Sequence, residues 1–138
     1  MPPHLLTIHR ENGGGCSSHR DSHGAVAAYE LGEEVWQAVV ADWRTAPLRP
    51  ELRATLVFLE VLTLRPEELT RTDAERVYEA GVSPQALRDA ATVCALFSMI
   101  TRLADSFGWD VPTRDVLSER SPLMLRDGYS LAAIFQRP

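Results

Sequence analysis

The chain has 138 residues, and 45% of them are hydrophobic and 24% charged, which suits a single globular domain. A net charge of −5 at pH 7 argues against a nucleic-acid-binding module, because such a module needs a basic surface to neutralise phosphates. Two cysteines form no disulfide framework, and neither a run of about 18 apolar residues nor a leader pattern occurs, so we expect a cytoplasmic protein without a membrane span.

The first half of the chain predicts one irregular segment and three helices. Residues 1–16 contain Pro2, Pro3 and three consecutive glycines, which disfavour regular structure. Apolar residues then recur at helical spacing. The expected helices cover about Ser17–Leu31, with Gly32 at the C′ position, then about 33–42, and about 50–64 with Pro50 in the first turn.

The second half predicts a short helix, a long helix and a weakly structured tail. Thr72–Glu75 has the pattern of a capping box and opens a helix that ends near Ala80. The longest helix covers about 84–107, and the tail shows a weak helical turn near Leu117. Because no segment alternates as a strand does, we expect an all-α fold of five or six helices in one domain, 1–138.

Helices 50–64 and 84–107 are apolar over wide faces. The long helix has two neighbouring apolar stripes, one of Val93, Leu96, Ile100, Leu103 and Phe107, the other of Leu87, Ala91, Cys94 and Ser98. A chain this short has few residues to cover both helices, so we expect a homo-oligomer. Trp36, Trp43 and Trp109 are expected to be core or interface anchors.

Residues 16–23 are the chemically densest stretch. Cys16 and His23 are seven residues apart and share a helical face, with His19 beside them. A cysteine at a helix N-terminus is favoured as the thiolate, and a neighbouring imidazole can take its proton. Redox chemistry at Cys16 is therefore one hypothesis. Cys94 lies in an apolar stripe and is expected in the core.

Two other hypotheses compete for this stretch. Its residues could simply form a solvated surface. Alternatively, Cys16, His19 and His23 could bind a metal, with His4 or His9 as the fourth ligand of a structural zinc site. The spacing matches no closed zinc module, so we predict neither a metal nor another cofactor.

Four segments, in order, resemble the AhpD-like/carboxymuconolactone decarboxylase superfamily, particularly its peroxidase-related, alkylhydroperoxidase-like branch. They lie within a similarity that covers about Pro3 to Tyr129. The matching segments are Ala41–Leu48 with the helix Ala54–Thr63 after it, Thr72–Ser83, Ala95–Asp105 and Leu125–Tyr129. The resemblance implies an AhpD-like helical bundle that self-associates through long apolar helices.

The resemblance also implies a redox site, from which this chain departs. The family motif is C-x-x-C-x-x-x-H with a glutamate upstream, which places Cys16 at the first cysteine and His23 at the histidine. His19 stands where the second cysteine would be, and His4 where the glutamate would be. The family usually has a few dozen residues before this motif, so a truncated or mispredicted start is one interpretation of the short N-terminal segment.

The resemblance implies a thiol peroxidase in which Cys16 attacks a hydroperoxide, His23 or His19 handles the proton, and an external thiol reduces the product. The alternative is a catalytically degenerate member that acts as an oligomeric binding or scaffold protein, favoured by the lost cysteine and glutamate. A lactone decarboxylase would not need the second cysteine, but we see no clamp for a substrate carboxylate beyond Arg20 and the histidines.

Overall fold

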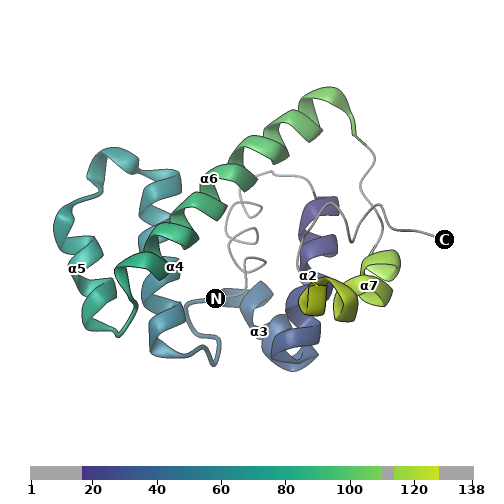
Figure 1. Cartoon of the computed structure of the whole chain (residues 1–138), viewed down its shortest axis with the longest axis horizontal. Helices are drawn as coiled ribbons and strands as arrows, with labels where there is room; N and C mark the ends of the chain where they lie inside the picture. Colours follow the sequence, from purple (N-terminus) through teal and green to yellow (C-terminus); the bar gives the residue numbers. More distant parts are fainter. Residues whose placement is uncertain (1–16, 110–113, 128–138) are drawn as a thin grey trace.

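The structure, a computed structural model, describes residues 17–109 and 114–127. Within these ranges the chain forms six α-helices and one short 3-10 helix, with no strand, so the all-α prediction is confirmed (Figure 1). The elements are α2 Ser17–Leu31, α3 Glu33–Asp42, α4 Pro50–Leu64, η1 Pro66–Glu68, α5 Arg71–Glu79, α6 Pro84–Phe107 and α7 Arg114–Asp127.

Local signals account for the ends of the predicted helices. Gly32 has a φ of 88°, a conformation that glycine adopts at no steric cost, and its N–H donates to the Ala28 carbonyl at 2.9 Å. The Ser83 hydroxyl caps α6 by accepting from the Ala86 N–H at 3.1 Å. The predicted bounds of α2, α3, α4 and α6 are confirmed.

The predicted capping box at Thr72 is wrong by two residues. The cap of α5 is Thr70, whose N–H and hydroxyl both donate to the Asp73 carboxylate, at 2.9 and 2.7 Å. Both threonines are followed by an acidic residue three positions on, so the sequence pattern fits either. Asp73 also forms an ion pair with Arg76, with 3.1 Å between Oδ1 and Nη1. This pair favours a cap at Thr70 over a cap at Thr72.

The weak turn predicted near Leu117 is instead a full helix. α7 has 14 residues and lies against α2, in the most extensive contact between two described helices. Pro122 inside α7 removes a backbone N–H and weakens the sequence signal for a helix. Packing against α2 outweighs that local cost, since most helical stability in proteins comes from tertiary contacts.

The described helices form two groups (Figure 1). The two groups share one hydrophobic core. α2, α3 and α7 pack together, and α4, α5 and α6 form the other group. The core runs from α2 and α3 into α4 and α6. Its buried side chains are Ala27, Trp36, Val39, Trp43, Ala46, Leu52, Leu56, Leu59, Ala90 and Cys94.

Arginine side chains fix the connector between the two groups. The Arg53 guanidinium on α4 donates to the carbonyl oxygens of Trp43 and Ala46, which lie in the turn after α3. Arg44 pairs with Glu60 of α4, and its guanidinium lies 4.8 Å from the centre of the Trp43 ring. These contacts hold the end of α3 against α4.

α6 is the one described helix that is long and apolar enough to cross a membrane. Core helices of soluble proteins meet the same criterion, and the N-terminal half of α6 packs on α4 and α5. The expectation that the chain has no membrane span therefore stays a prediction.

Candidate functional site

The candidate site begins at the first turns of α2. Cys16 directly precedes this helix in the sequence and lies outside the described residues, as do His4 and His9. His19 and His23 are both within α2 and are four residues apart. Residues four apart lie one turn from each other along a helix.

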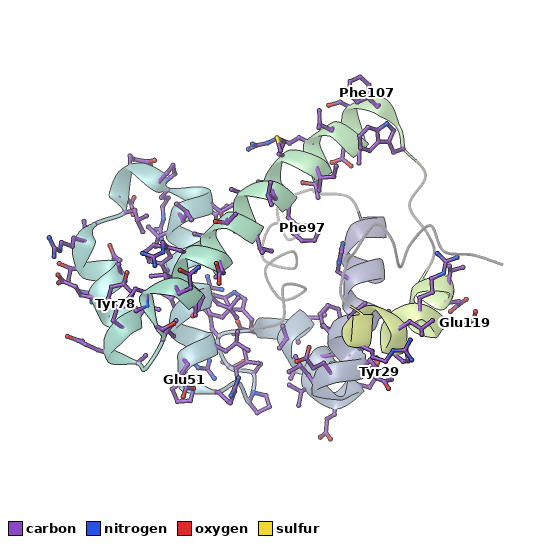
Figure 2. The ribbon with its side chains drawn as sticks, viewed as in Figure 1. Tyr29, Glu51, Tyr78, Phe97, Phe107 and Glu119 are labelled. Atoms are coloured by element: carbon purple, nitrogen blue, oxygen red, sulfur yellow. The ribbon has the colours of Figure 1, made fainter. Side chains whose placement is uncertain are left out.

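His23 lies where α2 faces α6. Its side chain is half-buried, and its ring meets the Phe97 ring edge to face, with centroids 4.7 Å apart and an interplanar angle of 89°. In Figure 2, Phe97 points from α6 toward α2. The imidazole is therefore held between two helices rather than on an open surface.

The residue after His23 brings α2 close to α3. Gly24 is buried, and a Cβ added there would lie 2.3 Å from Cζ2 of Trp36, far inside contact distance. Ala25, Val26 and Ala27 are buried as well. Small side chains thus let α2 pack closely against its neighbours, and this packing sets where His23 projects.

Phe97 belongs to the inward-facing side of α6. Leu87, Ala90, Cys94, Thr101 and Ala104 are buried at spacings of three and four residues around it. The Thr101 hydroxyl donates to the Phe97 carbonyl oxygen at 2.8 Å. Because buried residues lie on both sides of Phe97, the helix is anchored on both sides of the contact with His23.

The second cysteine has the role that the sequence predicts. Cys94 is 8% exposed and belongs to the hydrophobic core, and its Sγ lies 3.2 Å from the Thr63 hydroxyl. A small thiol in such a place behaves as an apolar core residue.

The three tryptophans differ in their surroundings. Trp36 and Trp43 are buried core anchors, as predicted. Trp109 is 50% exposed, so it is no core residue, and it stacks on Phe107 with centroids 6.0 Å apart. It follows Gly108, where α6 ends and the chain leaves the core.

A shallow hollow of about 220 Å³ opens between α2, α3 and α7. It is lined by Ala25, Ala28, Tyr29, Glu33 and Ser118. Ligand pockets usually enclose roughly 300–1,000 Å³. This hollow is smaller and open to solvent, so it is a weaker candidate than the surroundings of His23.

Sequence reasoning did not identify Gly24 or Phe97 as parts of the site. An isolated glycine inside a helical pattern is a signal of close packing and could have pointed to Gly24. The contact of Phe97 with His23 joins residues far apart in the chain, and helical spacing alone does not reveal it.

Within residues 17–109 and 114–127, no three His, Cys, Asp or Glu side chains are grouped as metal ligands. Cys16, His4 and His9, which the metal hypothesis requires, lie outside these ranges. Comparison of the chain with models of protein families and with curated proteins finds no match.

Proposed function

We propose that this chain is a peroxidase-related protein with an AhpD-like bundle, in which Cys16 reduces a hydroperoxide with the assistance of His23 and His19. The observation that carries the proposal is the placement of His23. His23 follows Cys16 by seven residues in the sequence, and its ring meets the Phe97 ring edge to face. A fixed imidazole near a helix-terminal cysteine is the arrangement that activates a thiol.

The proposed chemistry is a two-electron exchange between sulfur and oxygen. The Cys16 thiolate attacks one oxygen of the hydroperoxide, an S–O bond forms, and the O–O bond breaks. The cysteine becomes a sulfenic acid, and the departing alkoxide takes a proton from His23 or His19 to leave as an alcohol. Two molecules of an external thiol then restore Cys16, releasing water and the disulfide of that thiol.

The proposed reduction of Cys16 needs an external thiol, because the chain offers no second accessible cysteine for it. The chain has two cysteines, and Cys94 is buried in the core beside Thr63. A buried thiol is poorly placed to attack a sulfenic acid on another segment, since exchange requires access. The proposed partners are thus a hydroperoxide, a small thiol and further copies of the chain in the cytoplasm, with no cofactor, nucleic acid or membrane.

Substitution of Cys16 tests the activity directly. We expect Cys16→Ser to abolish peroxide consumption in the presence of a thiol reductant. Cys94→Ala is the matched control, because it removes the other thiol and should leave turnover in place. Unchanged activity in Cys16→Ser would contradict the proposal.

Thiol reactivity tests the activation of Cys16 separately from turnover. In the Cys94→Ala background, we expect Cys16 to be alkylated faster at pH 7 than a free cysteine, whose thiol pKa is about 8.5. His23→Gln should slow the reaction. Slow labelling that His23→Gln leaves unchanged would indicate that the histidines do not activate this thiol.

The second candidate is a catalytically degenerate member that serves as an oligomeric binding or scaffold protein. The exposed apolar side chains of α6 favour it, because they provide a surface for association. The resemblance adds that His19 and His4 replace the second cysteine and the glutamate. An unreactive Cys16 in a stable oligomer would support this candidate over the peroxidase.

A further inference from the structure

The C-terminal half of α6 exposes a continuous apolar stripe. We define the outer stripe as Leu96, Ile100, Leu103 and Phe107, which are spaced by four, three and four residues. All four side chains are exposed, from 39% for Leu103 to 68% for Phe107, and Met99 and Trp109 are exposed beside them. In Figure 2, Phe107 points away from the body of the molecule, opposite to Phe97.

The area of this surface sets it apart from the other exposed apolar residues. α4 and α5 expose fewer large apolar side chains, namely Val57, Leu64 and Tyr78, which is ordinary for a soluble protein. At roughly 150–250 Å² for each large side chain, the outer stripe with Met99 and Trp109 leaves on the order of 500 Å² of apolar surface in water. That is near the upper end of the roughly 300–600 Å² typical of the largest patch on a monomer.

We propose that the outer stripe packs against the outer stripe of a second copy of this chain, with the two α6 helices antiparallel. This proposal deepens, and rests on, the self-association named under the proposed function. The spacing of four, three and four residues is that of the a and d positions of helices that interlock side by side. When fully paired, two such faces together bury about 1,000 Å², which is the lower limit for a biological interface and fits a weak, reversible dimer.

The charge pattern of α6 suits pairing with itself. The outer stripe is flanked by Met99 and Ser106 on one side and by Phe97 and Ala104, which face the core, on the other, and none of the four is charged. A self-pairing therefore brings no like charges together, and a strongly charged partner would find no complement here. The opposite face of α6 is buried in the core, so the helix cannot be surrounded by lipid without leaving its place in the fold.

The antiparallel direction follows from the position of α4 and α5 along α6. The N-terminal half of α6 carries α4 and α5 beside it, whereas its C-terminal half extends beyond them (Figure 1). An antiparallel pair places these two bulky ends apart. With a positions opposite d positions, Leu96 then meets Phe107 of the second copy, and Ile100 meets Leu103 of the second copy.

Paired charge substitutions test both the surface and the direction. We expect Leu96→Glu and Phe107→Lys each to raise the dimer dissociation constant at least about 100-fold, measured by analytical ultracentrifugation. The double variant Leu96→Glu/Phe107→Lys should regain the dimer, because the antiparallel register places opposite charges together at both ends. Val57→Glu is the matched control, an exposed apolar residue outside the stripe that should leave the dimer intact.

Several results would overturn this proposal. Monomeric wild-type protein would do so, and binding of that monomer to phosphatidylcholine vesicles would assign the stripe to lipid. Single variants that dissociate the dimer without rescue in the double variant would exclude the antiparallel register. Circular dichroism checks that each variant keeps its helices. A Cys16→Ser variant that loses activity but keeps the dimer separates this test from that of the peroxidase.

Discussion

The contact between His23 and Phe97 determines where the imidazole of the candidate site lies. The two residues come from α2 and α6, and their rings meet at 4.7 Å with nearly perpendicular planes. Edge-to-face contacts of this kind restrict ring orientation and add roughly 0.5–1.5 kcal/mol beyond burial. Phe97 is therefore a positioning residue for the proposed reaction rather than a group that touches the peroxide.

Replacement of Phe97 should release His23. In Phe97→Ala we expect the NMR signals of the His23 ring to lose the ring-current shift that a neighbouring phenyl edge produces. Peroxide turnover should fall roughly tenfold or more, because misplacement of a catalytic group is costly. Ala95→Ser, at an exposed position of α6 outside the outer stripe, is the control. His23 signals that stay in place in Phe97→Ala would refute this role.

Gly24 should tolerate no side chain without a loss of stability. The Gly24→Ala methyl group would lie 2.3 Å from Trp36 Cζ2, so α2 and α3 must separate or the indole must move. We expect urea unfolding to show a loss of about 1–3 kcal/mol, the usual cost of overpacking. Combining Gly24→Ala with Trp36→Phe should cost less than the sum of the single changes. Strict additivity would contradict the steric explanation.

The N-terminus of α5 shows how side chains stabilise an element. The hydroxyl of Thr70 and then its N–H donate to the Asp73 carboxylate, and with the nearby Arg76 they hold the pKa of that carboxyl below its usual 3.8. Because these partners favour the charged form, Asp73 stabilises the folded state above its unfolded pKa. That stabilisation is lost as the pH falls through the lower folded pKa.

Asp73→Asn should make the free energy of unfolding less dependent on pH in the acidic range. We expect the wild-type chain to exceed the variant most in free energy of unfolding near neutral pH, with the difference shrinking as the pH falls below about 3.8. Urea unfolding across a pH series measures it. Thr70→Val, which removes one of the donors, should show part of the effect. A difference that is the same at every pH would exclude the carboxylate as its source.

At the scale of the whole molecule, one core links the two groups of helices. Trp36 and Trp43 belong to the α3 side, and Leu56, Leu59 and Cys94 to the α4 and α6 side, yet they form a single buried cluster. A continuous core makes unfolding cooperative in a domain of this size. The candidate site at His23 therefore depends on the α4 and α6 side as much as on α2.

Leu56→Ala tests this cooperativity. Leu56 is 2% exposed, so its truncation should cost about 2–5 kcal/mol. Tryptophan fluorescence and far-ultraviolet circular dichroism should report the same lowered midpoint. Val57→Ala, at the exposed neighbouring position, should stay within about 0.5 kcal/mol of wild type. Separate transitions for the two probes would show that the helix groups unfold independently.

Much of the helical framework could be predicted because its signals are local. Pro50 and Ser83 open helices, Gly32 and Gly108 close them, and apolar spacing marks the faces between. The core positions of Cys94, Trp36 and Trp43 follow from the same periodicity. These features depend on residues within a few helical turns of one another, so the local sequence is enough to specify them.

The remaining features arise from contacts between distant segments. α7 has a proline in its interior and weak apolar spacing, and it forms a helix because it packs on α2. Thr70 rather than Thr72 caps α5 because the Asp73 carboxylate reaches Thr70. Phe97 meets His23 across 74 positions of chain, and the outer stripe is exposed because α4 and α5 cover only part of α6. Periodicity predicts that a face is apolar, but the packing of the other helices determines whether that face is buried.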